Sequence, residues 1–348
     1  MHGFRTANFS PLDWVGAAFS TPLTSLLLAV VVSGAVIAFV GSRASTHVVL
    51  SEGAARSVKN RYAPERRALA IAAIAVVVVF VAENIIRGYV TNLGDAVSWW
   101  RFATPIASSA LSIAILAALI TFRGSAPSEA PVVTGARRTW TTFGPRGGLI
   151  LCGVVLLLLL ATTIAAGVTS AADGRGQYIW LEIPIPNEAE IDPIRLWYYG
   201  WAFGVPVLIA LAALIVTTAL ALRVNAARPF IRPETVAAER GLRSEVAGGA
   251  VAVATAGMLL ALAGAWRLIA RAGTATQLWI EGQNGGDPYE AAWRYAELAT
   301  AAGWLAPILE VIAFTLLLLV AARLRQKWPS PSPDEQLDER VDAATAGR

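Results

Sequence analysis

The fold of this chain is decided by a short stretch, Phe19-Ser20-Thr21-Pro22-Leu23, that the sequence nearly repeats as Phe102-Ala103-Thr104-Pro105-Ile106. Looser copies of the same aromatic-x-x-Pro element are Phe203-Gly204-Val205-Pro206 and Trp304-Leu305-Ala306-Pro307. The four prolines follow one another at intervals of 83, 101 and 101 residues. Each element opens a long apolar run, and proline is well tolerated at a helix start, where its missing N–H has no partner to lose. We therefore interpret the element as a repeated helix entry.

The apolar runs are long enough to cross a membrane. The chain is 56% hydrophobic and 15% charged, whereas a soluble domain carries about 25% charged residues. A stretch of about 20 apolar residues spans the hydrocarbon core of a bilayer. The net charge of +4 does not indicate nucleic-acid binding, because the basic residues lie in short segments between apolar runs. The single cysteine, Cys152, excludes an intrachain disulfide and is interpreted as a small core residue.

The composition predicts an all-α integral membrane protein with a seven-helix membrane domain over residues 23–322. An outer segment, 1–22, precedes the domain, and a Pro-Ser-rich and then acidic tail, 323–348, is predicted to be disordered. We expect the first run to be a retained anchor and not a signal peptide, because its positive charges follow it. The predicted spans are 23–41, 68–87, 102–122, 148–170, 198–222, 247–269 and 299–322.

Arginine and lysine alternate between the segments that join these spans. Segments 42–67, 123–147 and 223–246 and the start of the tail are basic, whereas 171–197 and 270–298 are acidic or mixed. Basic segments stay in the cytoplasm. The N-terminus is therefore predicted outside and the C-terminus inside, in a cell membrane of a bacterial type. Small β-like elements are expected in the outer segments around Trp180 and Trp279.

The spacing of the helix entries suggests parallel internal repeats of two helices each, with a last helix left over. Gly41-Ser42 and Gly124-Ser125 share the 83-residue offset of Pro22 and Pro105. Chance matching among apolar runs of low complexity is the alternative. Small residues in the sixth span, at Gly257, Ala261 and Ala265, are expected to pack closely on a neighbouring helix.

No known catalytic or cofactor motif is present. The two histidines, His2 and His47, lie outside the spans, and neither Lys59 nor Lys327 could hold retinal within one. We therefore expect no metal, no cofactor and no enzymatic activity. Ionisable residues within spans are functional candidates because burying them in lipid is costly. The candidates, which would form either a polar vestibule open to the outside or a set of interfacial ion pairs, are Glu310, Glu83, Asn84, Arg87, Arg267 and Arg271.

Glu310 is the most notable candidate because a lone carboxylate in hydrocarbon needs a partner. We predict that it faces the bundle and pairs with Arg267. Glu83 and Arg87, four residues apart, are predicted to lie on one helix face and to pair. Two function classes remain open. One is a permease-like or accessory subunit of a transport system, with an ATP-binding subunit as a possible partner. The other is a non-transporting scaffold or signalling partner that binds a cytoplasmic protein or anionic lipid through its basic segments.

Overall fold

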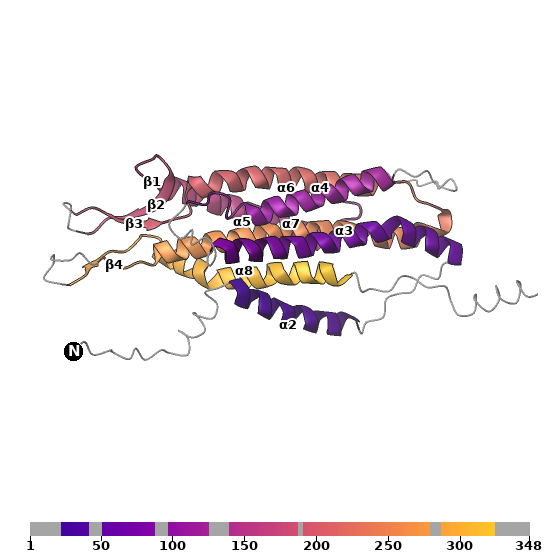
Figure 1. The fold of residues 1–348 in the computed structure, drawn as a ribbon, viewed down its shortest axis with the longest axis horizontal. Coiled ribbons are helices and arrows are strands. Elements are labelled where there is room, and N and C mark those ends of the chain that lie inside the picture. The colour runs from indigo at the N-terminus through magenta and orange to yellow at the C-terminus, as the bar shows by residue number, and fades with distance from the viewer. Residues whose placement is uncertain are drawn as a thin grey trace, which may run out of the picture.

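The computed structural model of the chain describes residues 22–41, 51–87, 97–124, 139–186, 191–278 and 287–323. The predicted outer segment and the predicted disordered tail lie almost wholly outside these ranges, and so do Phe19 and Trp279. The described part is mostly helical, and seven of its helices are long and apolar enough to cross a membrane (Figure 1). They are α2 (Pro22–Gly41), α3 (Glu52–Ile85), α4 (Thr104–Gly124), α5 (Arg146–Thr169), α6 (Trp201–Ala227), α7 (Val236–Gly273) and α8 (Ala296–Ala322).

Helix α7 lies at the centre of the bundle. In the apolar 18-residue stretch of α7, 89% of the residues are buried, whereas the same share is 17 to 44% in the other six helices. The helices α3, α4, α5, α6 and α8 all pack on it. Small residues allow this close approach: a Cβ added at Gly257 would lie 2.8 Å from the Pro105 carbonyl oxygen of α4. The expected role of Gly257 in helix packing is thereby confirmed.

Two helices extend well beyond their predicted spans. Helix α3 begins at Glu52, capped by the Ser51 hydroxyl, and not near residue 68, while α7 begins at Val236 and not near residue 247. The prediction missed these turns because a hydropathy window rejects charged segments, whereas the extensions are amphipathic. On α3 the buried positions continue at helical spacing through Ala54, Val58, Tyr62, Glu65 and Leu69.

The end of the bundle where α5 ends and α6 begins carries a small sheet. Strands β1 (Ala171–Ala172), β2 (Tyr178–Ile183) and β3 (Ile194–Trp197) form an antiparallel sheet in the order β1-β2-β3. Trp180 of β2 pairs with Trp197 of β3, so the β element predicted around Trp180 is confirmed. The centroids of the two rings, those of Trp180 and Trp197, are 5.1 Å apart. Strands β4 (Gln277–Leu278) and β5 (Tyr289–Glu290) pair after α7, next to the second predicted position. We call this end of the bundle the sheet end.

The helix-entry elements take different positions in their helices. Pro22 is the first residue of α2 and Pro105 the second of α4, whereas Pro206 and Pro307 lie inside α6 and α8. The rings of Phe102 and Phe203 contact each other edge to face at 5.3 Å, and Trp304 is exposed. The elements therefore share a sequence pattern but not one structural environment.

Candidate functional site

The predicted intramembrane charges lie at one level near the sheet end. Phe80 of α3 and Phe314 of α8 contact each other with ring centroids 5.7 Å apart. Glu83 and Glu310 each lie about one helical turn from these rings toward the sheet end. The two carboxylates therefore occupy similar depths, on neighbouring helices, as the sequence suggested.

Glu310 is paired with Arg267 by two parallel hydrogen bonds. Arg267 Nε donates to Glu310 Oε1 and Nη2 donates to Oε2, both at 2.7 Å. The Ser25 hydroxyl of α2 donates to Oε2 at 2.7 Å. Glu310 is 1% exposed, so it faces the bundle and not lipid. The predicted pair is confirmed, and the structure adds the hydroxyl that joins α2 to it.

This geometry stabilises the pair against the cost of burial. A bidentate arginine–carboxylate contact is among the strongest charge-assisted arrangements, and three donors satisfy the carboxylate here. Removing one member of a buried pair leaves the other charged and unpaired, which is far more costly than the net value of the pair. The contact thus holds α2, α7 and α8 in register.

Glu83 and Arg87 also pair, as predicted, but more weakly. Arg87 Nε lies 3.8 Å from Glu83 Oε1, and Arg87 Nη1 donates to the Ser98 hydroxyl at 3.2 Å. Asn84 donates to the carbonyl of Phe80 in its own helix and does not join the pair. Arg271 is exposed near the end of α7. The six candidates are therefore two ion pairs, one self-satisfied amide and one exposed arginine.

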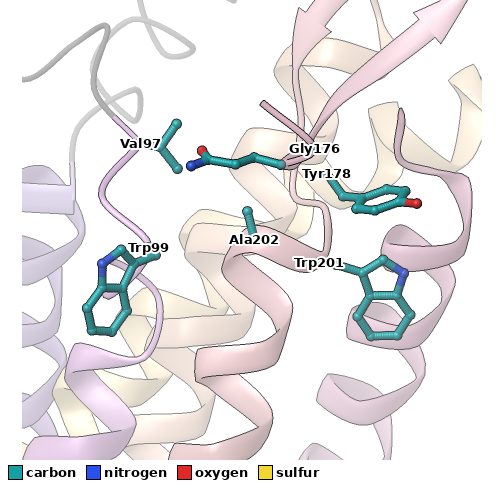
Figure 2. A pocket seen from close by; sticks show the side chains of 7 residues that line it. Val97, Trp99, Gly176, Tyr178, Trp201 and Ala202 are labelled. Carbon is teal, nitrogen blue, oxygen red and sulfur yellow. The ribbon is translucent and has the colours of Figure 1, made fainter. Parts of the chain in front are cut away.

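A pocket of about 370 Å³ lies beside the sheet, and none of the predicted candidates lines it. Figure 2 shows Trp99 and Trp201 on its opposite sides, with Ala202 between them. The Trp201 ring packs against α5 at Gly167, where an added Cβ would lie 2.5 Å from the ring. The aromatic rings thus form separated walls and not a closed cage. The lining residues are Val97, Trp99, Gly176, Gln177, Tyr178, Trp201 and Ala202.

A second charged site, which the sequence did not predict, lies at the opposite end of the bundle. Arg243 and Glu239 of α7 are both fully buried, together with Tyr62 of α3. The Tyr62 hydroxyl donates to Glu239 Oε2 at 2.9 Å and accepts from Arg243 Nε at 3.0 Å. Arg243 Nη1 donates to the Arg228 carbonyl at 2.8 Å, and its guanidinium lies 4.2 Å from the Phe230 ring centroid. We call this group the buried charge cluster.

Further pairs surround this cluster. Arg228 lies at the end of α6, and its Nη1 is 2.7 Å from Oε1 of Glu65 in α3. Both side chains are almost fully buried. Arg66 Nε lies 3.1 Å from Oε1 of Glu245 in α7, and Arg66 Nη2 donates to the Arg323 carbonyl at 2.7 Å. One sequence signal for these contacts was the four-residue spacing of Glu239 and Arg243, which indicates a helical ion pair.

The charged side chains of the two sites contact mainly one another. Among the described residues, no three histidine, cysteine, aspartate or glutamate side chains are grouped to hold a metal ion. The carboxylates of the two sites are each engaged by an arginine side chain. The architecture is that of a multi-pass helical membrane protein. Comparison of the chain with protein-family models, curated proteins and solved structures gave no match.

Proposed function

We propose that this chain is an accessory subunit of a membrane transport system, without a conducting path or an enzymatic activity of its own. The observation that carries the proposal is the burial of α7. A helix that is 89% buried over its apolar window fills the axis along which a bundle of this size would otherwise enclose a pathway. Ion pairs to neighbouring helices at both ends of α7, Glu245 with Arg66 of α3 and Arg267 with Glu310 of α8, hold it in place.

The orientation that we propose has the N-terminus outside and the C-terminus in the cytoplasm of a cell membrane. The alternation of arginine-rich segments supports it. The sheet end would then face outward, and the buried charge cluster would lie on the cytoplasmic side. The internal repeat of two helices also stays a proposal. The pair α6 and α7, which would form one unit, packs together, whereas α2, which would pair with α3, packs chiefly on α8.

The cytoplasmic end offers a surface for a soluble partner such as an ATP-binding subunit. Three carboxylates of this end, Glu65, Glu239 and Glu245, pair with arginines inside the bundle. The charged side chains that remain exposed there are therefore mainly basic, and include Arg56, Lys59, Arg67, Arg123, Arg146, Arg223 and Arg240. Such a surface complements an acidic partner face.

The second candidate is a permease-like role, and one observation favours it. Helix α2 is the least buried of the seven, and its Ser25 hydroxyl contacts the Glu310–Arg267 pair. A helix held to α8 with so little buried surface could move during a transport cycle. In that case Glu310→Gln would leave a stable protein that has lost transport.

Copurification and reconstitution test the proposal. The tagged chain, extracted from its native membranes in a mild detergent, should run as a particle larger than its own 36.7 kDa with bound detergent. The purified chain alone, in liposomes with a potassium gradient, should pass no more ions than empty liposomes. A particle that contains only this chain, or ion flux through the chain alone, would overturn the accessory role.

A further inference from the structure

Positive charge exceeds negative charge where α3, α4 and α7 reach the sheet end. Each of the two carboxylates at this level already pairs with one arginine, Glu83 with Arg87 and Glu310 with Arg267. Two more arginines share the level, Arg101 before α4 and Arg271 in the last turn of α7. Within the described part of the chain, neither of them forms an ion pair with a carboxylate at 4.0 Å or less.

Arg101 is the arginine whose position is hardest to explain as packing. It lies in the turn before α4, with its guanidinium 4.9 Å from the centroid of the Phe102 ring. The charges that act on it are those of Arg87, Glu83 and Arg271. Burial, followed by repulsion from Arg87, lowers the pKa of Arg101 to about 10. Two arginines repel Arg101 and one carboxylate, Glu83, attracts it, so positive charge is in excess around this guanidinium.

The helix dipoles act differently on these three arginines. Arg87 and Arg271 lie at helix C-termini, where the partial negative charge of the helix favours a cation. Arg101 lies three residues before the start of α4, where the partial positive charge disfavours one. Helix dipoles thus favour two of the three arginines and oppose the third. The single carboxylate that acts on Arg101, Glu83, is shared with Arg87, so a negative ligand would compensate for the remaining positive charge.

We propose that Arg101, with Arg87 and Arg271, forms a binding site for a phosphate-bearing anion at the sheet end. The planar guanidinium fork matches phosphate oxygens through two parallel hydrogen bonds. Arg87 is held toward the site by the Ser98 hydroxyl, which belongs to the same turn as Arg101. The phosphate could be part of a lipid headgroup or of a soluble ester, since both present the same oxygens.

Thermal unfolding of the full chain in nanodiscs of phosphatidylcholine tests the site with two probes. In one arm, inorganic phosphate replaces chloride at constant ionic strength. In the other, phosphatidylglycerol is added, and native mass spectrometry counts the lipids retained. Stabilisation by phosphate alone identifies a soluble ligand, retention of phosphatidylglycerol alone identifies a lipid, and both together support the shared chemistry. No effect of either probe overturns the proposal.

Variants separate the site from a general attraction of anions. Arg101→Gln should weaken binding of the active probe at least about tenfold, the effect of losing one charge-assisted contact. Arg195→Gln, which removes an exposed arginine of the sheet, is the control and should bind as the unchanged chain does. In chloride buffer Arg101→Gln should unfold at the same or a higher temperature, because repulsion is relieved.

Two results contradict this account. Equal binding by the unchanged chain, Arg101→Gln and Arg271→Gln would show that these arginines form no site. A lower unfolding temperature for Arg101→Gln in chloride would show a structural contact in place of an unsatisfied charge. If Arg101→Gln does not fold at all, the exposed Arg271 decides, since Arg271→Gln should fold and bind more weakly.

Discussion

Replacing Glu310 by glutamine should destabilise the bundle by about 2 to 3 kcal/mol. A buried ion pair that loses one partner costs about 3 to 5 kcal/mol, because the remaining charge is left uncompensated. The Glu310 side chain is 1% exposed but that of Arg267 is 22% exposed, so part of the arginine charge stays solvated and the expected loss falls to the lower end of this range or somewhat below it. Glutamine also keeps one acceptor for Arg267.

A double-mutant cycle isolates the pair from other effects. Glu310→Gln combined with Arg267→Gln should recover about 1 to 2 kcal/mol of the loss, since no unpaired charge remains. The matched control is Glu182→Gln, which breaks the Arg195–Glu182 pair of the sheet at 2.9 Å and 54% and 37% exposure. An exposed pair contributes at most about 1 kcal/mol.

Unfolding in mixed micelles of increasing dodecyl sulfate content measures these differences. The expected order of stability is the unchanged chain, Glu182→Gln, the double variant and then Glu310→Gln. Equal stability of Glu310→Gln and the unchanged chain would refute the structural pair. If that stable variant had also lost transport, the permease-like role would take its place.

Three further predictions concern other parts of the bundle. Gly257→Ala should destabilise by about 1 to 3 kcal/mol, because its Cβ would meet the Ser109 side chain, whereas Gly153→Ala, with open space, should not destabilise; unfolding curves that coincide would contradict this packing. Tyr62→Phe should cost about 1 to 3 kcal/mol, because Glu239 and Arg243 lose their shared hydroxyl; an unchanged stability would show that water replaces it. Single cysteines in a Cys152→Ser chain should react from outside at positions 184 and 285, and at 60, 130 and 237 only after permeabilisation; outside labelling at 130 would contradict the topology.

The sequence was sufficient for the features that depend on hydropathy and helical spacing. Seven apolar runs became seven helices, and the shared depth of Arg267 and Glu310 on consecutive helices was enough to predict their pair. Both inferences depend on contacts that a bilayer imposes, because a charge in hydrocarbon needs a partner on an adjacent helix.

The buried charge cluster could not be predicted in the same way. Its members come from α3, from the segment after α6 and from α7, and they meet only because α3 and α7 continue past the apolar runs. Charged residues between spans are usually solvated, so Glu65, Arg228 and Arg243 gave no reason to expect burial. The sequence signal that could have revealed the extension was the helical spacing of apolar residues before the predicted span of α3, at Ala54, Val58 and Tyr62.

Accessibility of α7 tests the central claim most directly. Single cysteines would replace Ala250, Ala254, Ala261 and Ala265, which are at most 1% exposed, in a Cys152→Ser chain reconstituted in liposomes. A small water-soluble thiol reagent, applied from either side, should leave all four unmodified, while a cysteine at the exposed Arg240 should react. Modification of the α7 positions would reveal a water-filled path along the axis and contradict a closed, non-conducting bundle.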